Sequence, residues 1–175
     1  MIEDARLIAP GTRIEADLCI IGGGAAAISL ALEYMKSGRQ TIVIPGGGPN
    51  QTATGIDLYR GKVDPAGSHE PLEENRLRMW GGTTTVWGGR CIPFDPIDFA
   101  ARSWIPNSGW PVGLNELKDY ISSANVLSEA GVADFDARSV FPTTQAEILK
   151  GFDNEDFVTW PLERWSMPTD YSKRY

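Results

Sequence analysis

The sequence predicts an α/β fold with a parallel sheet, and four features of its N-terminal part carry this prediction. A short apolar run at residues 17–21 is followed by glycines at 22–24, a helix-like segment at 25–36 and a second apolar run at 41–44. Short apolar runs of this kind are typical of strands buried on both faces of a sheet. Strand, helix and strand in this order form a βαβ unit with parallel strands and a right-handed crossover.

Each of these elements has its own local justification. Cys19 lies inside the first apolar run, and we expect it to be a small buried side chain. The helix at 25–36 is predicted from apolar spacing of three and four residues, and Gly38 is a plausible end for it. Its expected buried face consists of Ile28, Ala31, Leu32 and Met35.

The rest of the chain shows weaker patterns, and residues 1–15 are interpreted as a lead-in. Residues 50–112 are rich in turn residues, so we expect loops and short strands there. Apolar spacing predicts a helix at 114–130, ended by Gly131. We further expect a short helix from a capping box at Thr144 to about Lys150, a strand at 157–160, and the beginning of an element at 169–175. A complete sheet of this class has about five or six strands, so the sheet of this chain is predicted to be incomplete.

Composition excludes several classes of function. The 175 residues carry 16 basic and 23 acidic side chains, a net charge of −7, and one histidine. The basic surface required for nucleic-acid binding is therefore missing. Neither a signal peptide nor an apolar segment of about 20 residues is present, so a cytoplasmic protein without membrane contact is expected. Two isolated cysteines suggest neither a metal site nor a disulfide.

The glycine-rich break carries the main functional signal. Gly22, Gly23, Gly24, Ala25, Ala26 and Ala27 fit the pattern G-x-G-x-x-G/A between a strand and a helix. The first position allows a tight turn, the third lets backbone approach a pyrophosphate, and the last keeps helix and strand close. This context predicts a Rossmann-like fold that binds FAD or NAD(P). A purely structural glycine turn is the alternative.

One feature of such folds is missing from this chain. An acidic residue usually follows the second strand and binds the adenosine ribose, but Pro45 stands there and residues 46–50 contain no carboxylate. Asn50 or Gln51 are weak substitutes.

A second glycine-rich segment combines charge, hydroxyls and aromatic rings. The residues of interest are Arg78, Gly81, Gly82, Thr83, Thr84 and Thr85, and tryptophans stand on both sides of the threonines. Exposed backbone N–H groups and hydroxyls suit a polar anionic ligand. From these residues alone, a plain glycine-rich hairpin is almost equally plausible.

Several motifs in order resemble the N-terminal part of a glucose–methanol–choline (GMC) type flavin oxidoreductase. They are R-x-x-GG-T-T-x-x-W-GG at 78–89, D-F at 98–99, S-GW-P at 108–111, L-x-x-Y at 117–120 and, more faintly, residues 165–169. The resemblance implies FAD and the oxidation of an alcohol or sugar CH–OH group by hydride transfer. It also implies that the glycine fingerprint holds the pyrophosphate, and that residues 78 and 81–85 line the cofactor towards the flavin. Val86 occupies the place of the histidine that binds FAD covalently in some relatives.

The resemblance divides the chain into the lead-in at 1–15, an FAD-binding βαβ unit with flavin-contacting loops at 16–112, and a truncated remainder at 113–175. The family's catalytic histidine lies beyond the matching region, and His69 stands in a loop where the family places no base. No catalytic residue is therefore assigned.

We expect the FAD-binding portion of an oxidoreductase, inactive by itself, with a complementing chain or self-association as a possible partner. An NAD-binding module and a non-catalytic dinucleotide-binding remnant remain as alternatives.

Overall fold

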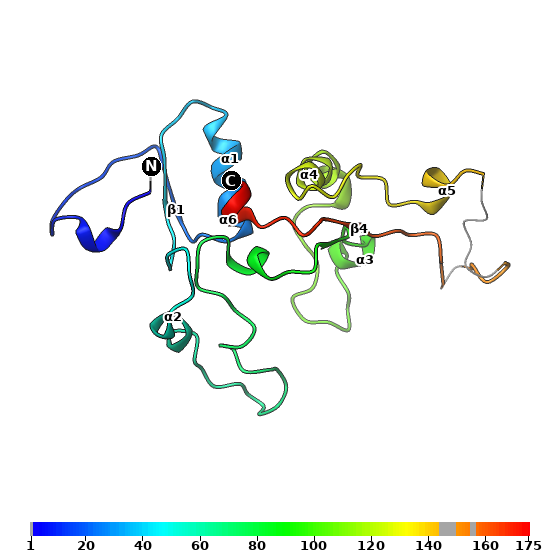
Figure 1. Ribbon diagram of the computed structural model, residues 1–175. Helices are drawn as coiled ribbons and strands as arrows, with labels where there is room; N and C mark the ends of the chain where they lie inside the picture. The colour runs from blue at the N-terminus through cyan, green and yellow to red at the C-terminus, as the bar shows by residue number, and fades with distance from the viewer. Residues whose placement is uncertain (1, 144–149, 155–156) are drawn as a thin grey trace. The chain divides into compact units, whose positions relative to one another are not determined.

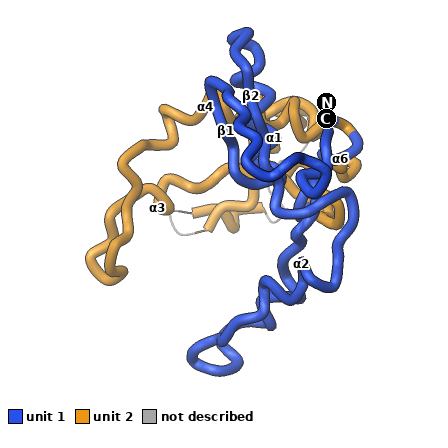
Figure 2. The backbone as a smooth tube through the Cα atoms, turned by 90° about the vertical axis from the view of Figure 1, so that its left-hand side faces the viewer, with its two compact units in different colours: residues 1–83, 171–173, 175 blue, residues 84–170, 174 orange. Residues whose placement is uncertain are grey.

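The computed structural model describes residues 2–143, 150–154 and 157–175 (Figure 1). The chain divides into two compact units, shown in two colours in Figure 2. Unit 1 contains residues 1–83, 171–173 and 175, and unit 2 contains residues 84–170 and 174.

Unit 1 is built on a two-stranded parallel sheet. Strand β1 (Leu18–Ile21) pairs with β2 (Thr41–Ile44) in parallel, with Leu18 opposite Thr41 and Ile21 opposite Ile44. Helix α1 (Ala25–Met35) connects them, and Gly38 follows it with φ +73. The predicted strand–helix–strand order is confirmed, and the molecule is a mixed α/β structure with a small parallel sheet.

The prediction that β1 is buried on both faces is wrong for one face. Ile20 is buried together with Ile28 and Ala31 of α1, whereas Cys19 is exposed and Ile21 is 86% exposed. Successive side chains of a strand point to opposite faces of the sheet. The buried residues of α1 lie on the face of Ile20, so the face of Cys19 and Ile21 stays exposed. Residues 12–16 line a pocket on the other face, together with Cys19, Ile42 and Ile44. Met35, expected on the buried face of α1, is also exposed.

The remaining elements of unit 1 are short. The lead-in contains a 3-10 helix, Ala5–Leu7, whose first turn is capped by Asp4. Hydrogen bonds from Arg6 lower the pKa of Asp4 to about 2. Helix α2 (Ala53–Asp57) is capped by Thr52, whose hydroxyl accepts a hydrogen bond from the N–H of Gly55. Helix α6 is Tyr171–Arg174, of which residues 171–173 belong to unit 1.

Unit 2 combines one longer helix with short elements. Helix α4 (Leu114–Leu127) confirms the helix predicted at 114–130, although it ends three residues earlier. Strands β3 (Arg90–Cys91) and β4 (Arg164–Trp165) pair in antiparallel orientation. The short helices are α3 (Pro96–Phe99) and α5 (Ala137–Val140).

Several sequence-based expectations differ from the structure. Helices α2 and α3 were not expected, because four- and five-residue helices are too short to show apolar periodicity. The strand predicted at 157–160 is absent from the described residues, and the chain pairs instead at 164–165, where the polar Arg164 gives no strand signal. The capping-box helix predicted from Thr144 falls largely on residues 144–149, outside the described residues. No helix in the described part of the chain is long and apolar enough to cross a membrane.

A polar network joins distant segments of unit 2. The Thr169 hydroxyl donates to Glu129 at 2.8 Å, and the Nε of Arg174 donates to the other oxygen of Glu129 at 2.9 Å. Ser166 and Thr169 are buried and hydrogen-bonded to each other, and the indole of Trp87 donates to the carbonyl of Thr169. The network ties the end of α4 to the segment that follows β4.

Glu129→Gln is expected to lower the melting temperature near neutral pH and to have less effect in acid. Hydrogen bonds from Arg174 and Thr169 hold the pKa of Glu129 below its ordinary value of 4.5. A carboxyl whose pKa is lowered by folding stabilises the fold above its unfolded pKa and loses this contribution as pH falls through the folded pKa. Melting temperatures of both forms across an acid pH series check this. A difference that stays constant throughout the series would contradict it.

Candidate functional site

The turn between β1 and α1 follows directly from its glycines. Gly22 has φ +126, a conformation that favours glycine. Its N–H donates to the carbonyl of Ile44 at 2.9 Å, which anchors the turn to the end of β2. A Cβ placed on Gly22 would lie 3.9 Å from the Cβ of Ala27. The start of α1 therefore lies close against the turn.

The N-terminus of α1 has unused hydrogen-bond donors. Gly24 is the N-cap of α1 and has no side chain that could cap the helix. The first helical hydrogen bond runs from the N–H of Ile28 to the carbonyl of Gly24. Within the described chain, the N–H groups of Ala25, Ala26 and Ala27 have no hydrogen-bond partner. A Cβ on Gly24 would meet nothing within 4 Å, so the space at the N-cap position of the helix is open. Free N–H groups and the positive end of the helix dipole favour an anion.

The second glycine-rich segment lies directly against the first. The N–H of Gly81 donates to the carbonyl of Gly23 at 2.8 Å. A Cβ on Gly82 would lie 3.1 Å from the Cα of Gly24, and one on Gly23 would lie 2.7 Å from the Cβ of Pro45. Gly81 and Gly82 also have positive φ angles of 84 and 54. The two motifs therefore meet backbone to backbone, an approach that a side chain would obstruct.

A third segment, the glycine run after β2, was not singled out as part of the site from the sequence. The N–H of Trp80 donates to the carbonyl of Gly48 at 2.8 Å. A Cβ on Gly47 would overlap the carbonyl oxygen of Arg78. In the sequence, the three consecutive glycines at 46–48 could have indicated this contact, because only glycine permits such a close approach of two backbones.

Arg78 lies beside this third segment. Built onto Gly46, a Cβ would be 3.0 Å from the Cζ of Arg78 and 3.2 Å from its Nε. The guanidinium also lies 5.9 Å from the ring centre of Tyr59. Its Nε is buried and has no hydrogen-bond partner in the described structure.

The three threonines divide between the units. Thr83 is exposed and is the last residue of the 1–83 segment of unit 1, while Thr84 and Thr85 belong to unit 2. All three lie in a 3-10 helix at Gly82–Thr85, and Thr84 is buried. Of the predicted site residues, unit 1 therefore brings together residues 22–27, 78, 81 and 82. Thr84 and Thr85 belong to unit 2.

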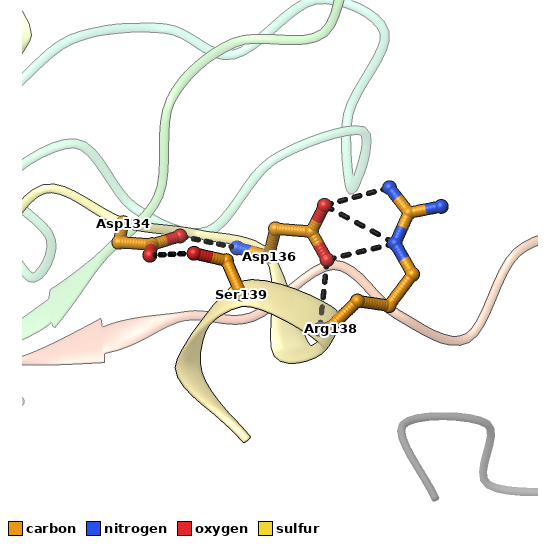
Figure 3. A network of polar contacts seen from close by, with 4 residues as sticks. All are labelled: Asp134, Asp136, Arg138 and Ser139. Atoms are coloured by element: carbon orange, nitrogen blue, oxygen red, sulfur yellow. Dashed lines mark hydrogen bonds and ion pairs between the residues drawn. The ribbon is translucent and has the colours of Figure 1, made fainter. Parts of the chain in front are cut away.

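Other clusters of titratable groups are occupied by internal contacts. In Figure 3, the Asp134 carboxylate accepts hydrogen bonds from Ser139 and from the N–H of Asp136, and Asp136 pairs with Arg138. The bonds from Ser139 and Arg138 lower the pKa values of Asp134 and Asp136, respectively. Among the described residues, no three His, Cys, Asp or Glu side chains lie together in a way that would hold a metal ion.

The single histidine and the two cysteines form no reactive group with one another. His69 is exposed, and its Nδ1 lies 2.6 Å from the carbonyl oxygen of Glu70. Burial raises the pKa of the Cys91 thiol, which favours its uncharged form. These positions offer no general base beside the glycine motifs in the described structure.

The fold and the site together define a class of structure: a mixed α/β chain in which a strand–glycine turn–helix unit packs against a second glycine-rich segment. Comparison with known proteins adds no further identification. No family model, no curated protein and no solved structure matches this chain.

Proposed function

We propose that unit 1 binds a dinucleotide, FAD, at the turn between β1 and α1, in a Rossmann-like fold. The observation that carries this proposal is the set of three free N–H groups at Ala25–Ala27 beside the open space at Gly24. A pyrophosphate is the anion that this geometry suits, since it accepts several hydrogen bonds from a helix N-terminus.

The second glycine-rich segment supports a ligand longer than a phosphate. Gly81 and Gly82 add bare backbone directly beside the first motif, and Arg78 places a positive charge beside Gly46, after the end of β2. Together with the motif resemblance to GMC-type enzymes, this favours FAD and an oxidoreductase that acts on the CH–OH group of an alcohol or sugar. FAD, when bound, would supply the acceptor for the hydride, while the residues of this chain bind and orient it.

The residues present fit the pyrophosphate of FAD, but they do not provide the base that alcohol oxidation requires. Hydride transfer from an alcohol needs a base within hydrogen-bond reach of the hydroxyl. The only histidine, His69, is exposed in a loop. This favours the alternative that the chain alone binds a dinucleotide without catalysis.

Titration of the purified chain with FAD tests the proposal. Binding is expected to change the flavin absorbance bands and to quench flavin fluorescence with a stoichiometry of about one. Absence of FAD binding would contradict the proposal, and binding of NAD⁺ in its place would support the NAD-module alternative.

The 175-residue chain with added FAD is expected not to oxidise simple alcohols or sugars, because its one histidine, His69, is exposed in a loop. A dye-coupled assay under air and without oxygen checks this. Flavin reduction by any of these substrates, lost in His69→Ala, would contradict it and make the chain a catalyst by itself.

The exposed apolar face of the sheet in unit 1 favours the binding of another protein chain. Ile21 and Ile44 are both exposed apolar side chains on β1 and β2, and such faces favour association. We propose a complementing chain or a second copy of this chain as that partner.

A further inference from the structure

The end of β2 has no group that would bind a ribose in the usual way. In dinucleotide-binding folds, this position faces the adenosine ribose. An Asp or Glu there accepts hydrogen bonds from free ribose hydroxyls, and a nearby Arg accommodates a ribose phosphate. Here Pro45 and residues 46–51 provide no carboxylate.

The side chain that occupies this place is Arg78. Its guanidinium lies so close to Gly46 that a Cβ there would be 3.0 Å from Cζ, 3.1 Å from Nη2 and 3.2 Å from Nε. Gly46 has no positive φ angle, so a side chain at this position would displace the Arg78 guanidinium without straining the backbone.

In the described structure, the guanidinium of Arg78 has no acceptor for its buried Nε, and its Nη atoms are not among the buried polar atoms. Its Nε makes no hydrogen bond with any residue that the structure describes, and its Cζ lies 5.9 Å from the centre of the Tyr59 ring. The neighbouring Arg60, by contrast, forms ion pairs with Asp57 and Glu73. A guanidinium is always charged, and a buried N–H without a partner is unfavourable, so a bound oxygen acceptor would be stabilised here.

We propose that Arg78 recognises the adenosine ribose in place of the missing carboxylate, so that this site prefers nucleotides with a phosphate on that ribose. The inference rests on the proposed dinucleotide site. Arg78 would donate hydrogen bonds to ribose oxygens of FAD and would pair more strongly, in a bidentate manner, with a 2′-phosphate. A carboxylate at this position would do the reverse, because it repels the phosphate.

Calorimetric titration with two probes tests the role of Arg78. ADP-ribose and 2′-phospho-ADP-ribose share the pyrophosphate and differ only in the phosphate on the adenosine ribose. The wild-type chain is expected to bind the phosphorylated probe at least about tenfold more tightly, as one charged hydrogen bond implies. Arg78→Gln should remove the preference and weaken FAD binding, and Arg78→Glu should reverse the preference.

Arg76→Gln is the matched control. Arg76 is exposed two positions away, and its substitution removes the same charge, so the preference should remain. Melting temperatures of all variants show that each chain is folded. Equal wild-type affinities for the two probes, or a preference that survives in Arg78→Gln, would overturn the inference while leaving dinucleotide binding intact. Failure of both probes and of FAD to bind would overturn the inference and the proposed function together.

Discussion

Gly24→Val is expected to lower the affinity for FAD by at least about 100-fold while leaving the chain folded. The valine methyl groups would occupy the open space beside the N–H groups of Ala25–Ala27, where the pyrophosphate is proposed to bind. Loss of two charged hydrogen bonds of about 1.5–3 kcal/mol each accounts for this magnitude. The backbone tolerates the change, because Gly24 has φ −88 and ψ −172 and no neighbour within 4 Å of a Cβ.

Gly113→Val is the control for the effect of valine at a helix N-cap. Gly113 is the N-cap of α4, with φ −103 and ψ 163, and a Cβ there would meet only Glu116 at 3.9 Å. Both variants should lose a similar, small amount of stability, since glycine is preferred to valine at this position. FAD titration and thermal unfolding of both variants check the prediction. Unchanged FAD affinity in Gly24→Val would contradict the assignment of the turn as a pyrophosphate site.

Gly89→Ala is expected to destabilise unit 2 by about 2–4 kcal/mol. Gly89 has φ +83, and an L-residue with a side chain pays about 1–2 kcal/mol for this conformation. The added Cβ would also overlap the carbonyl oxygen of Ser166 and lie 3.1 Å from the Cβ of Pro168. The carbonyl of Gly89 accepts the N–H of Ser166 at 2.7 Å, so relief of the overlap would strain this hydrogen bond.

Gly88→Ala provides the comparison at the preceding residue. A Cβ on Gly88 would meet nothing within 4 Å, and its φ is not positive. Urea unfolding of the three forms measures the difference, with the Gly88 variant within about 0.5 kcal/mol of wild type. Similar loss in both variants would show that the contact between Gly89 and Ser166 is not what stabilises this region.

The sequence by itself predicted β1, α1 and β2 and their parallel pairing. These elements depend on local signals: apolar runs, helical spacing and glycines where the chain turns. The same local signals located α4. They missed α2 and α3, which are shorter than one apolar repeat, and placed a strand at 157–160, whereas the described chain forms its strand at Arg164–Trp165.

What only the tertiary structure decided is how distant segments meet. Burial of Cys19 and Ile21 was predicted from their own strand, but it depends on which face α1 covers, and both are exposed. The approach of Gly82 to Gly24 and the position of Arg78 beside Gly46 join residues more than thirty positions apart. Spacing along the chain carries no information on such contacts. Glycine runs show where close backbone approach is sterically possible, and the packing of the folded chain determines which segments use it.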